Sequence, residues 1–495
     1  MANTNKNRTK KGAEQHSSKG KQHSSKGKQR RRSAKSRERD RTLRGQKKHA
    51  KELERKGKLA ARDALNSIID RFELFTKCVC YLTALLYDLD IQWTDDDDSY
   101  LRTPQYPLIE LFVAFTICVC SGANSYRSVV KIWDKNAEFF RAALPNLPTE
   151  KDNPGRARAP SYECLRLALL RLRKDAVATF IAVITRSRIL NELEASGFKH
   201  LILALDGKTD RAQEYEVDKT LKSHQERHLY KREYIVSLFS YFGSVAVDQE
   251  LVLHKENENK ACIRIVKRYC KGKRAIITGD ALNTTIKVAT AIRAAGSNVH
   301  FMLAVKDNNP KLRKAIKAAF QKYQHLAVRY SSPEEKNHGR TKVRYVLCLP
   351  ASLVQEYLGE WAPLVQSVIL AKTISVENKY GKKRQPETRI YISSLPRSET
   401  NFAQLAYTAV RAHWGVEAMH YILDVTFKQD RIKFKNTKLH EIRVIINKLA
   451  LALLRAAGDR DNQKVSIADR RSGGDVSEGL AVLCEALRGA DKIAA

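Results

Sequence analysis

The sequence predicts an α/β protein whose centre is a mixed sheet flanked by helices. Three observations predict the α/β region, a helical region before it and a basic tail at the start of the chain. Apolar runs of strand length alternate with helical segments over residues 198–310, residues 60–190 carry apolar side chains at helical spacing, and residues 1–58 are basic and low in complexity. A chain of 495 residues can bury a full core and divide into two or three domains.

Residues 1–58 are predicted to form a disordered basic tail. The string QHSSKGK occurs twice in tandem, at 15–21 and 22–28, and the tail holds 22 Lys and Arg against 5 Asp and Glu. Because apolar residues are few, no core offsets the entropy of ordering the segment. Such a tail is typical of a nonspecific DNA-binding arm, a solubilising extension or a nuclear-import signal, and all three stay open.

Residues 60–190 are predicted to form a helical N-terminal domain. Helices are expected at 65–89, 107–120, 126–133 and 162–189. Residues 145–160, rich in Pro, Gly and charge, indicate a linker. The apolar stretch 107–120 contains Glu110 and is shorter than the roughly 20 residues that a membrane span needs, so no membrane insertion is expected.

Residues 198–455 are predicted to form the principal domain. Strands are expected at 200–205, 235–242, 244–253, 275–278 and 300–305, and helices at 260–270 and 284–295. A hairpin with Gly243 between its strands follows the first strand, and an alternation of helix and strand follows the hairpin. This order is the pattern of an RNase H-like core.

Residues 325–395 interrupt that alternation and are predicted to be a β-rich insertion. Strands are expected at 326–330, 342–349, 365–374 and 388–392. After the insertion, a helix that begins near residue 401 is expected to continue through Glu417, and an amphipathic helix is expected at 439–457. Residues 456–495 are predicted to be a polar C-terminal tail with one helical stretch at 478–488.

Three carboxylates stand where metal ions could be held. Asp206 follows the apolar run 201–205, and Asp280 follows the run 275–278. If these runs are neighbouring strands, their ends lie about 4.8 Å apart, which allows two carboxylates to share a metal ion. The helix that carries Glu417 could bring in the third carboxylate and complete a two-metal site for in-line displacement at phosphorus.

The predicted helix around Glu417 carries a polar stripe. His413, Glu417, His420 and Asp424 fall at offsets 0, 4, 7 and 11, so they share one face. Four polar groups on a half-buried helix indicate a metal and phosphate site, with a satisfied polar network as the alternative. Gly415 lowers helix stability and indicates close approach of a neighbouring strand or of DNA.

The net charge of +36 indicates a polyanionic partner, and nucleic acid is the commonest. Lys208 and Lys306 stand close to predicted strand ends, where they could contact phosphates or be simple surface charge. Arg340 and Arg344 belong to a basic stretch of the insertion that is a candidate clamp for DNA. A solvated sheet face is the competing interpretation of that stretch.

Several strings resemble a known family, the H-repeat-associated (ISAs-type) insertion-sequence transposases, a branch of the DDE transposases. They are LDGKT, KENENK, ITGDAL, LAVKDNNPKL, HGRTKVR, RIYISSL and HWGVEAMHYILDVTF. Two upstream strings, YPLIELFVAFTICVCSGANSYRSV and PSYECLRLALLRL, resemble the helical domain of the same family. The resemblance covers roughly residues 100–455.

The resemblance implies a catalytic triad of Asp206, Asp280 and Glu417, which would hold Mg²⁺ or Mn²⁺, with two ions expected. It places His413, Trp414 and Asp424 in the surrounding signature, and His413 and Trp414 join Arg411 as candidate DNA-binding residues. It also makes residues 60–190 the candidate for binding the DNA ends of the element.

The function that the resemblance implies is DNA transposition, in which a phosphodiester is cleaved at the element's ends and the freed end is joined to target DNA. The implied partner is double-stranded DNA, and joining two ends implies at least a homodimer. Nine cysteines without the spacing of a disulfide framework indicate a reducing compartment, here the cytoplasm and its nucleoid. A hydrolytic nuclease on the same core, or a non-catalytic DNA-binding descendant, are the alternatives.

Overall fold

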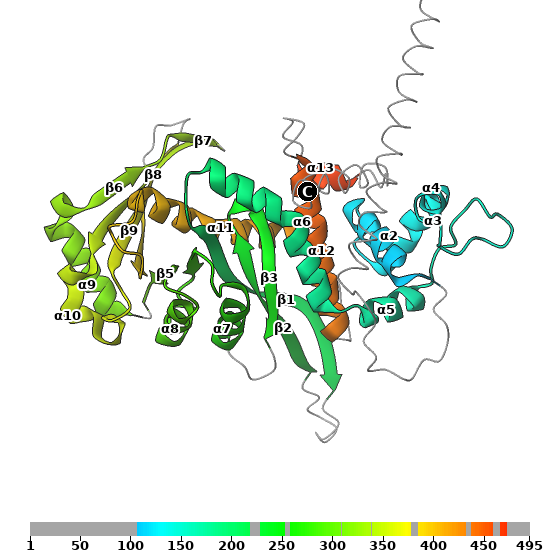
Figure 1. The fold of residues 1–495 in the computed structure, drawn as a ribbon, viewed down its shortest axis with the longest axis horizontal. Coiled ribbons are helices and arrows are strands. Elements are labelled where there is room, and N and C mark those ends of the chain that lie inside the picture. The colour runs from blue at the N-terminus through cyan, green and yellow to red at the C-terminus, as the bar shows by residue number, and fades with distance from the viewer. Residues whose placement is uncertain are drawn as a thin grey trace, which may run out of the picture. The chain divides into compact units, whose positions relative to one another are not determined.

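The computed structural model describes residues 106–217, 228–252, 258–307, 309–337, 339–377, 385–431, 437–458 and 466–472. All of them belong to the second of two compact units, Glu73–Ala495, and are drawn in colour in Figure 1. The predicted tail at 1–58 and the predicted helices at 65–89 and 478–488 lie outside the described residues. Within the described ranges, no helix is long and apolar enough to cross a membrane.

The described residues build one mixed sheet of ten strands (Figure 1). The strands are β1 (Leu201–Val217), β2 (His228–Ser240), β3 (Val245–Val252), β4 (Ala275–Gly279), β5 (Val299–Val305), β6 (Val328–Ser331), β7 (Glu335–Asn337), β8 (Arg340–Pro350), β9 (Ser367–Glu377) and β10 (Glu387–Ser393). Their order is β3-β2-β1-β4-β5-β10-β9-β8-β6, with β7 paired to β8. Strands β1, β4 and β5 are parallel, and the other pairs are antiparallel.

Strands and helices alternate in the first half of the sheet, as the sequence predicts. Helix α7 (Glu258–Tyr269) connects β3 to β4, and helix α8 (Ile286–Ala294) connects β4 to β5. Every residue of β4 is buried, and β5 is buried apart from Ala304. Continuous apolar strands of this kind are expected where a parallel sheet is covered on both faces.

Strand β1 is longer than predicted, because it continues past Leu205 to Val217. Residues 206–217 are mostly polar and contain no apolar run, so their pattern alone does not indicate a strand. Their conformation follows from antiparallel pairing with β2, which reaches as far as Val217 opposite His228. Cross-strand partners, and not local propensity, determine the length of this strand.

The predicted β-rich insertion extends the central sheet. Strand β10 pairs antiparallel with β5, and Ile390 lies opposite Val305. Strands β9, β8 and β6 then continue outward from β10. The predicted insertion therefore shares a continuous hydrogen-bonded ladder with the parallel strands.

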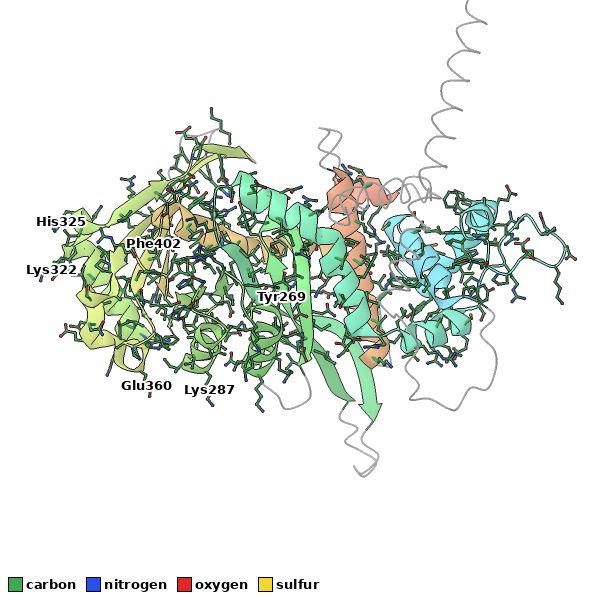
Figure 2. All side chains as sticks on the ribbon, in the orientation of Figure 1. Tyr269, Lys287, Lys322, His325, Glu360 and Phe402 are labelled. Carbon is green, nitrogen blue, oxygen red and sulfur yellow. The ribbon has the colours of Figure 1, made fainter. Side chains whose placement is uncertain are left out.

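Helix α9 (Pro310–Lys322) lies between β5 and β6, where no element was predicted. Proline at the first helical position leaves no hydrogen bond unmade. Leu312, Ile316 and Phe320 are buried at a spacing of four residues. Figure 2 shows the opposite, charged side of such surface helices, where Lys287 of α8 and Lys322 point outward.

The N-terminal part of the described chain is helical. Its helices are α2 (Leu108–Cys120), α3 (Tyr126–Lys135), α4 (Ala137–Ala143), α5 (Tyr162–Arg171) and α6 (Lys174–Ala195). Ser125 and Ser161 cap α3 and α5 through their hydroxyl groups. The single helix predicted at 162–189 is two helices, because Leu172 has an extended backbone that ends α5.

These helices share one hydrophobic core with the C-terminal helices α11 (Phe402–Val425) and α12 (Thr437–Gly458). Phe115 of α2, Val416 of α11 and Leu449 of α12 are buried in the same cluster, together with Phe239 of β2. Phe239 also explains Gly415, since a Cβ there would lie 2.7 Å from Cε1 of its ring. The close neighbour predicted at Gly415 is therefore a strand side chain.

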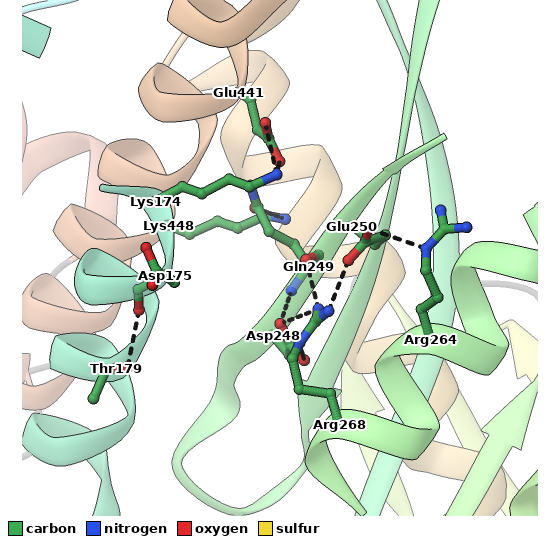
Figure 3. Close-up of polar contacts among 10 residues, drawn as sticks. All are labelled: Lys174, Asp175, Thr179, Asp248, Gln249, Glu250, Arg264, Arg268, Glu441 and Lys448. Carbon is green, nitrogen blue, oxygen red and sulfur yellow. Dashed lines mark hydrogen bonds and ion pairs between the residues drawn. The ribbon is translucent and has the colours of Figure 1, made fainter. Parts of the chain in front are cut away.

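Charged side chains of two helices contact β3 at the edge of the sheet (Figure 3). In α7, Arg264 lies 3.1 Å from Glu250 and Arg268 lies 2.9 Å from Asp248, both on β3. The ammonium group of Lys448 in α12, which is buried, donates a 2.7 Å hydrogen bond to Gln249 Oε1. Both helices are therefore held against β3 by charged side chains.

Helix α13 (Ile467–Ser472) lies within the predicted C-terminal tail and packs near α12. The guanidinium group of Arg471, only 4% exposed, donates to the backbone carbonyls of Val119 and Ala123 at 3.0 and 3.3 Å. Gly122 has a positive φ of 104°, and a Cβ there would lie 2.5 Å from the Arg471 carbonyl oxygen. This contact ties α13 to the end of α2.

Candidate active site

Two of the predicted carboxylates lie side by side where the parallel pairing of β1 with β4 ends. Leu205 of β1 is in register with Gly279 of β4, and Asp206 and Asp280 are the next residues along each chain segment. Both aspartates are half-buried. The sequence-based expectation of neighbouring strands therefore matches the register, although β1 continues beyond Asp206.

His420 of α11 is the nearest polar partner of Asp206. Its Nδ1 lies 3.2 Å from Oδ2 of Asp206, and the residue is 9% exposed. Its Nε2 is buried without a hydrogen-bond partner among the described residues. The polar stripe of α11 thus contacts the aspartate pair through this histidine.

Asp424, one turn further along α11, is held by Lys208. The Lys208 ammonium pairs with Asp424 and lies 3.0 Å from Asp430 Oδ1, and its side chain is 12% exposed. Burial raises the pKa of Asp424, Lys208 lowers it, and the neighbouring charge of Asp430 raises it. Lys208, a candidate phosphate contact in the sequence, is here part of an internal ion-pair triad.

Glu417, the third predicted carboxylate, lies exposed on α11. Its charge acts on Arg389 and Tyr391, both on β10. Among the described residues, no group of three or more His, Cys, Asp and Glu is arranged to hold a metal ion. The structure therefore brings Asp206 and Asp280 together and leaves Glu417 beside β10.

The donor set at the aspartate pair fits a hard divalent cation. Mg²⁺ is usually bound by one or two carboxylates, with water and substrate phosphate oxygens completing its octahedron. Asp206 and Asp280 supply two half-buried carboxylates at one sheet edge, and this edge is partly open to solvent. A preformed cage of three ligands is not required for such an ion.

Glu258, the first residue of α7, is a third acidic group near the pair and was not among the predicted site residues. Its carboxylate accepts hydrogen bonds from Tyr234 and Asn283 at 2.6 and 2.7 Å. Burial raises the pKa of Glu258, and the charges of Asp280 and Asp206 act in the same direction, while the two hydrogen bonds lower it. Glu258 belongs to the KENENK string. This string is part of the family resemblance, but it does not mark Glu258 as a site residue.

A second polar centre, which we call the arginine–tryptophan hollow, lies where α11 meets β8, β9 and β10. Guanidinium carbons of Arg411, Arg389 and Arg344 lie 4.3, 4.9 and 5.5 Å from the centre of the Trp414 ring. About 340 Å³ of space, part of it open solvent, lies within the hollow. It is lined by Arg344, Tyr345, Val346, Ala371, Lys372, Thr373, Glu387, Arg389, Tyr407, Val410, Arg411 and Trp414.

Several donors in the arginine–tryptophan hollow lack partners. Within the described chain, Arg411 Nη1, Arg344 Nε and Trp414 Nε1 are buried and make no hydrogen bond. Burial lowers the pKa of Arg411, and the charge of Arg344 acts in the same direction. Arg344 itself pairs with Glu335 of β7. Arg389 pairs with Glu387 of the same strand at 2.7 Å. The hollow therefore gathers three guanidinium groups, two of them paired with carboxylates, and it keeps buried donors that no described residue satisfies.

The remaining predicted site residues are spread around these two centres. His413 is buried on α11, and its Nδ1 has no hydrogen-bond partner in the described residues. Lys306 is exposed directly after β5, and Arg340 begins β8 opposite Glu377 of β9. Arg389 was not among the predicted site residues, because only its strand pairing brings it to Trp414.

A comparison with known protein families identifies one that this chain matches. Residues 197–453 match the family described as the transposase DDE domain. The chain is 28% identical over 270 residues to "Putative transposase YncI" of Escherichia coli O157:H7, and the match covers 52% of this chain and 63% of that relative. The chain therefore spans less than two thirds of the length of this curated relative.

A comparison of folds gives a distant likeness to a structure titled "Cryo-EM structure of piggyBac transposase synaptic complex with hairpin DNA (SNHP)". The sequence identity is 10%, the TM-score is 0.35, and the match covers 86% of this chain and 81% of that chain. A likeness with so low a TM-score does not establish a shared fold. The sequence match spans more than half of the chain and includes both aspartates and the whole of α11, and the chain belongs to the transposase DDE domain family.

Proposed function

We propose that this chain is a DNA transposase that cleaves phosphodiesters at the ends of a mobile element and transfers the freed ends to target DNA. The observation that carries the proposal is the in-register placement of Asp206 and Asp280 on β1 and β4, in a chain of the transposase DDE domain family. The strand order β3-β2-β1-β4-β5 supports an RNase H-like core. The H-repeat-associated (ISAs-type) branch is the proposed subfamily.

Asp206 and Asp280 are the proposed ligands of divalent metal, Mg²⁺ or Mn²⁺, and Glu417 is the proposed third ligand. Bound ions would stabilise charge on the attacking and leaving oxygens of the phosphodiester. Glu417 is supported by its place on α11, three residues before His420, so the two residues share one helix face. His420 orients Asp206 through the 3.2 Å contact, and Lys208 keeps the adjacent stretch of α11 in place.

The arginine–tryptophan hollow supports a DNA partner. Trp414 lies one helical turn before Glu417 and is surrounded by Arg344, Arg389 and Arg411. Guanidinium groups with unsatisfied donors bind phosphate oxygens strongly, because charged hydrogen bonds are about twice as strong as neutral ones. We propose that the hollow holds backbone phosphates of double-stranded DNA beside the carboxylates, in a cytoplasmic protein associated with the nucleoid.

A strand-transfer assay with matched substitutions tests the proposal. Asp206→Asn and Asp280→Asn are expected to abolish cleavage and joining on a plasmid that carries the gene and its native flanking DNA. Asp307→Asn is the control, because Asp307 lies two residues after the end of β5 and its side chain is 87% exposed. If either of the first two variants cleaves at the wild-type rate, that aspartate is not part of the site.

We also propose a homodimer on DNA, because joining requires two DNA ends at once. Mass measurement of the protein bound to paired ends is expected to give at least two chains per complex. A single chain on paired ends that still joins them would refute the dimer. Products that are cut but never joined would instead indicate a nuclease.

A further inference from the structure

Asn283 is fully buried within the turn that follows Asp280. Its exposed fraction is 0%, and both polar atoms of its amide have partners. The Nδ2 group donates to Asp280 Oδ1 at 3.1 Å and to Glu258 Oε1 at 2.7 Å. The Oδ1 atom accepts from Cys262 Sγ at 3.1 Å, so the amide orientation is fixed by a donor and by two acceptors.

Asp280 receives a second bond from the same residue. The backbone N–H of Asn283 donates to Asp280 Oδ1 at 3.0 Å. Within the described residues, both hydrogen bonds to the Asp280 carboxylate therefore reach the same oxygen. Two donors on one oxygen fix the side-chain rotamer and turn the other oxygen away from Asn283.

Glu258 is held at its far oxygen by Tyr234. The Tyr234 hydroxyl donates to Glu258 Oε2 at 2.6 Å, so each Glu258 oxygen has a partner. Tyr234 reaches this position by lying across Gly207, the residue after Asp206. A Cβ at Gly207 would lie 2.2 Å from the Tyr234 hydroxyl oxygen, and only glycine leaves that path open.

The helix that carries Glu258 is itself anchored. Arg264 and Arg268 of α7 pair with Glu250 and Asp248 of β3 (Figure 3). These ion pairs join the later turns of α7 to β3, the strand beside β2. A continuous series of hydrogen bonds runs from Tyr234 of β2 through Glu258 of α7 to Asn283. It ends on the carboxylate of Asp280.

We propose that Tyr234, Glu258 and Asn283 form a positioning relay, which holds the carboxylate of Asp280 in the orientation that a divalent metal ion requires. The proposal rests on the proposed function for the role of Asp280 itself. Partners that orient a metal-binding carboxylate typically contribute about 10–100-fold to metal affinity or activity. None of the three relay residues touches the metal or the substrate in this proposal.

Calorimetric titration of the DNA-free full-length protein with Mn²⁺ tests the relay. Asn283→Ala is expected to weaken Mn²⁺ binding by at least about 10-fold. Tyr234→Phe, which removes one hydroxyl and keeps the ring, is expected to weaken it less, and thermal melting of this variant should show an intact fold. Asn298→Ala, at an exposed asparagine, is the control and should bind as the wild type does.

Glu258→Gln separates positioning from direct coordination. Glutamine can still accept from Asn283 and can donate to the Tyr234 oxygen, so Mn²⁺ binding should stay near that of the wild type, whereas Glu258→Ala should weaken it. A Glu258→Gln variant as weak as Glu258→Ala would overturn the relay and make Glu258 a ligand through its charge. Wild-type binding by folded Asn283→Ala and Tyr234→Phe proteins would also overturn it.

Asp280→Asn distinguishes the failure of this proposal from the failure of the proposed function. If Asp280→Asn abolishes Mn²⁺ binding and the relay variants do not change it, the relay is wrong and the metal site stands. If Asp280→Asn binds Mn²⁺ as the wild type does, the proposed metal site is wrong, and the relay is wrong with it.

Discussion

Replacement of Lys208 by methionine should destabilise the protein in a pH-dependent way. Lys208 pairs with Asp424 and Asp430, and removal of it leaves two carboxylates together without a cation. Loss of one partner of a fully buried pair costs about 3–5 kcal/mol. Because Asp424 and Asp430 are 29% and 22% exposed, solvent reduces this loss, and we expect about 2 kcal/mol at pH 7.

The pH dependence follows from Asp424. Burial raises the pKa of Asp424 in the folded state above its unfolded value, and loss of Lys208 raises it further. The folded state then binds more protons than the unfolded state, so the variant's free energy of unfolding rises as the pH falls through that raised pKa. The difference between Lys208→Met and wild type should therefore shrink as the pH falls from 7 toward the raised pKa of Asp424.

Urea denaturation at several pH values measures this difference. Lys287→Met, at an exposed lysine of α8, is the control and should cost nothing at any pH. A second substitution, Asp424→Asn, should recover part of the stability lost in Lys208→Met, because it removes one of the two unpaired charges. A deficit that is constant with pH and is not relieved by Asp424→Asn would refute the reasoning.

Three further predictions concern DNA and packing. Arg389→Ala should weaken DNA binding, measured by fluorescence anisotropy. It should also lower the slope of log affinity against log salt by about 0.9 for each phosphate interaction that the substitution removes. Lys287→Ala is the control and should leave this slope almost unchanged. Deletion of residues 1–58 should lower the same slope without a change in melting temperature; an unchanged slope would mean that the tail does not touch DNA. Gly415→Val should lower stability by about 1–3 kcal/mol through overpacking against Phe239, seen as a lower urea midpoint, and unchanged stability would contradict the packing described.

The position of the aspartate pair could be predicted from the sequence for a simple physical reason. Runs such as 201–205 and 275–278 are almost wholly apolar, which is typical of parallel strands buried on both faces. A polar residue that follows such a run is therefore expected where the buried part of the strand ends. Helix α9 also has a local signal that is sufficient to predict it, since Pro310 precedes apolar residues at a spacing of four.

The rest of the site depends on contacts that no local pattern encodes. Arg344 and Arg389 reach Trp414 only because β8, β9 and β10 pair in a particular register. Glu258 contacts Asn283 only because α7 packs against β3, β2 and α8. Such pairings are set by the tertiary arrangement, so candidates on α11 could be predicted from helical spacing but their partners could not.

The pairing of β10 with β5 bears on how this protein could change over evolutionary time. A domain joined by a linker can be lost or exchanged without harm to its neighbour, but β10 supplies the backbone partners of a strand next to β4. Removal of the segment from β6 to β10 would expose the unpaired edge of β5, and bare edges of apolar strands invite aggregation. Substitutions on the outer strands β8 and β9 are therefore expected to be tolerated more readily than loss of the whole segment, while the β5–β10 seam is inherited as a unit with the aspartate pair.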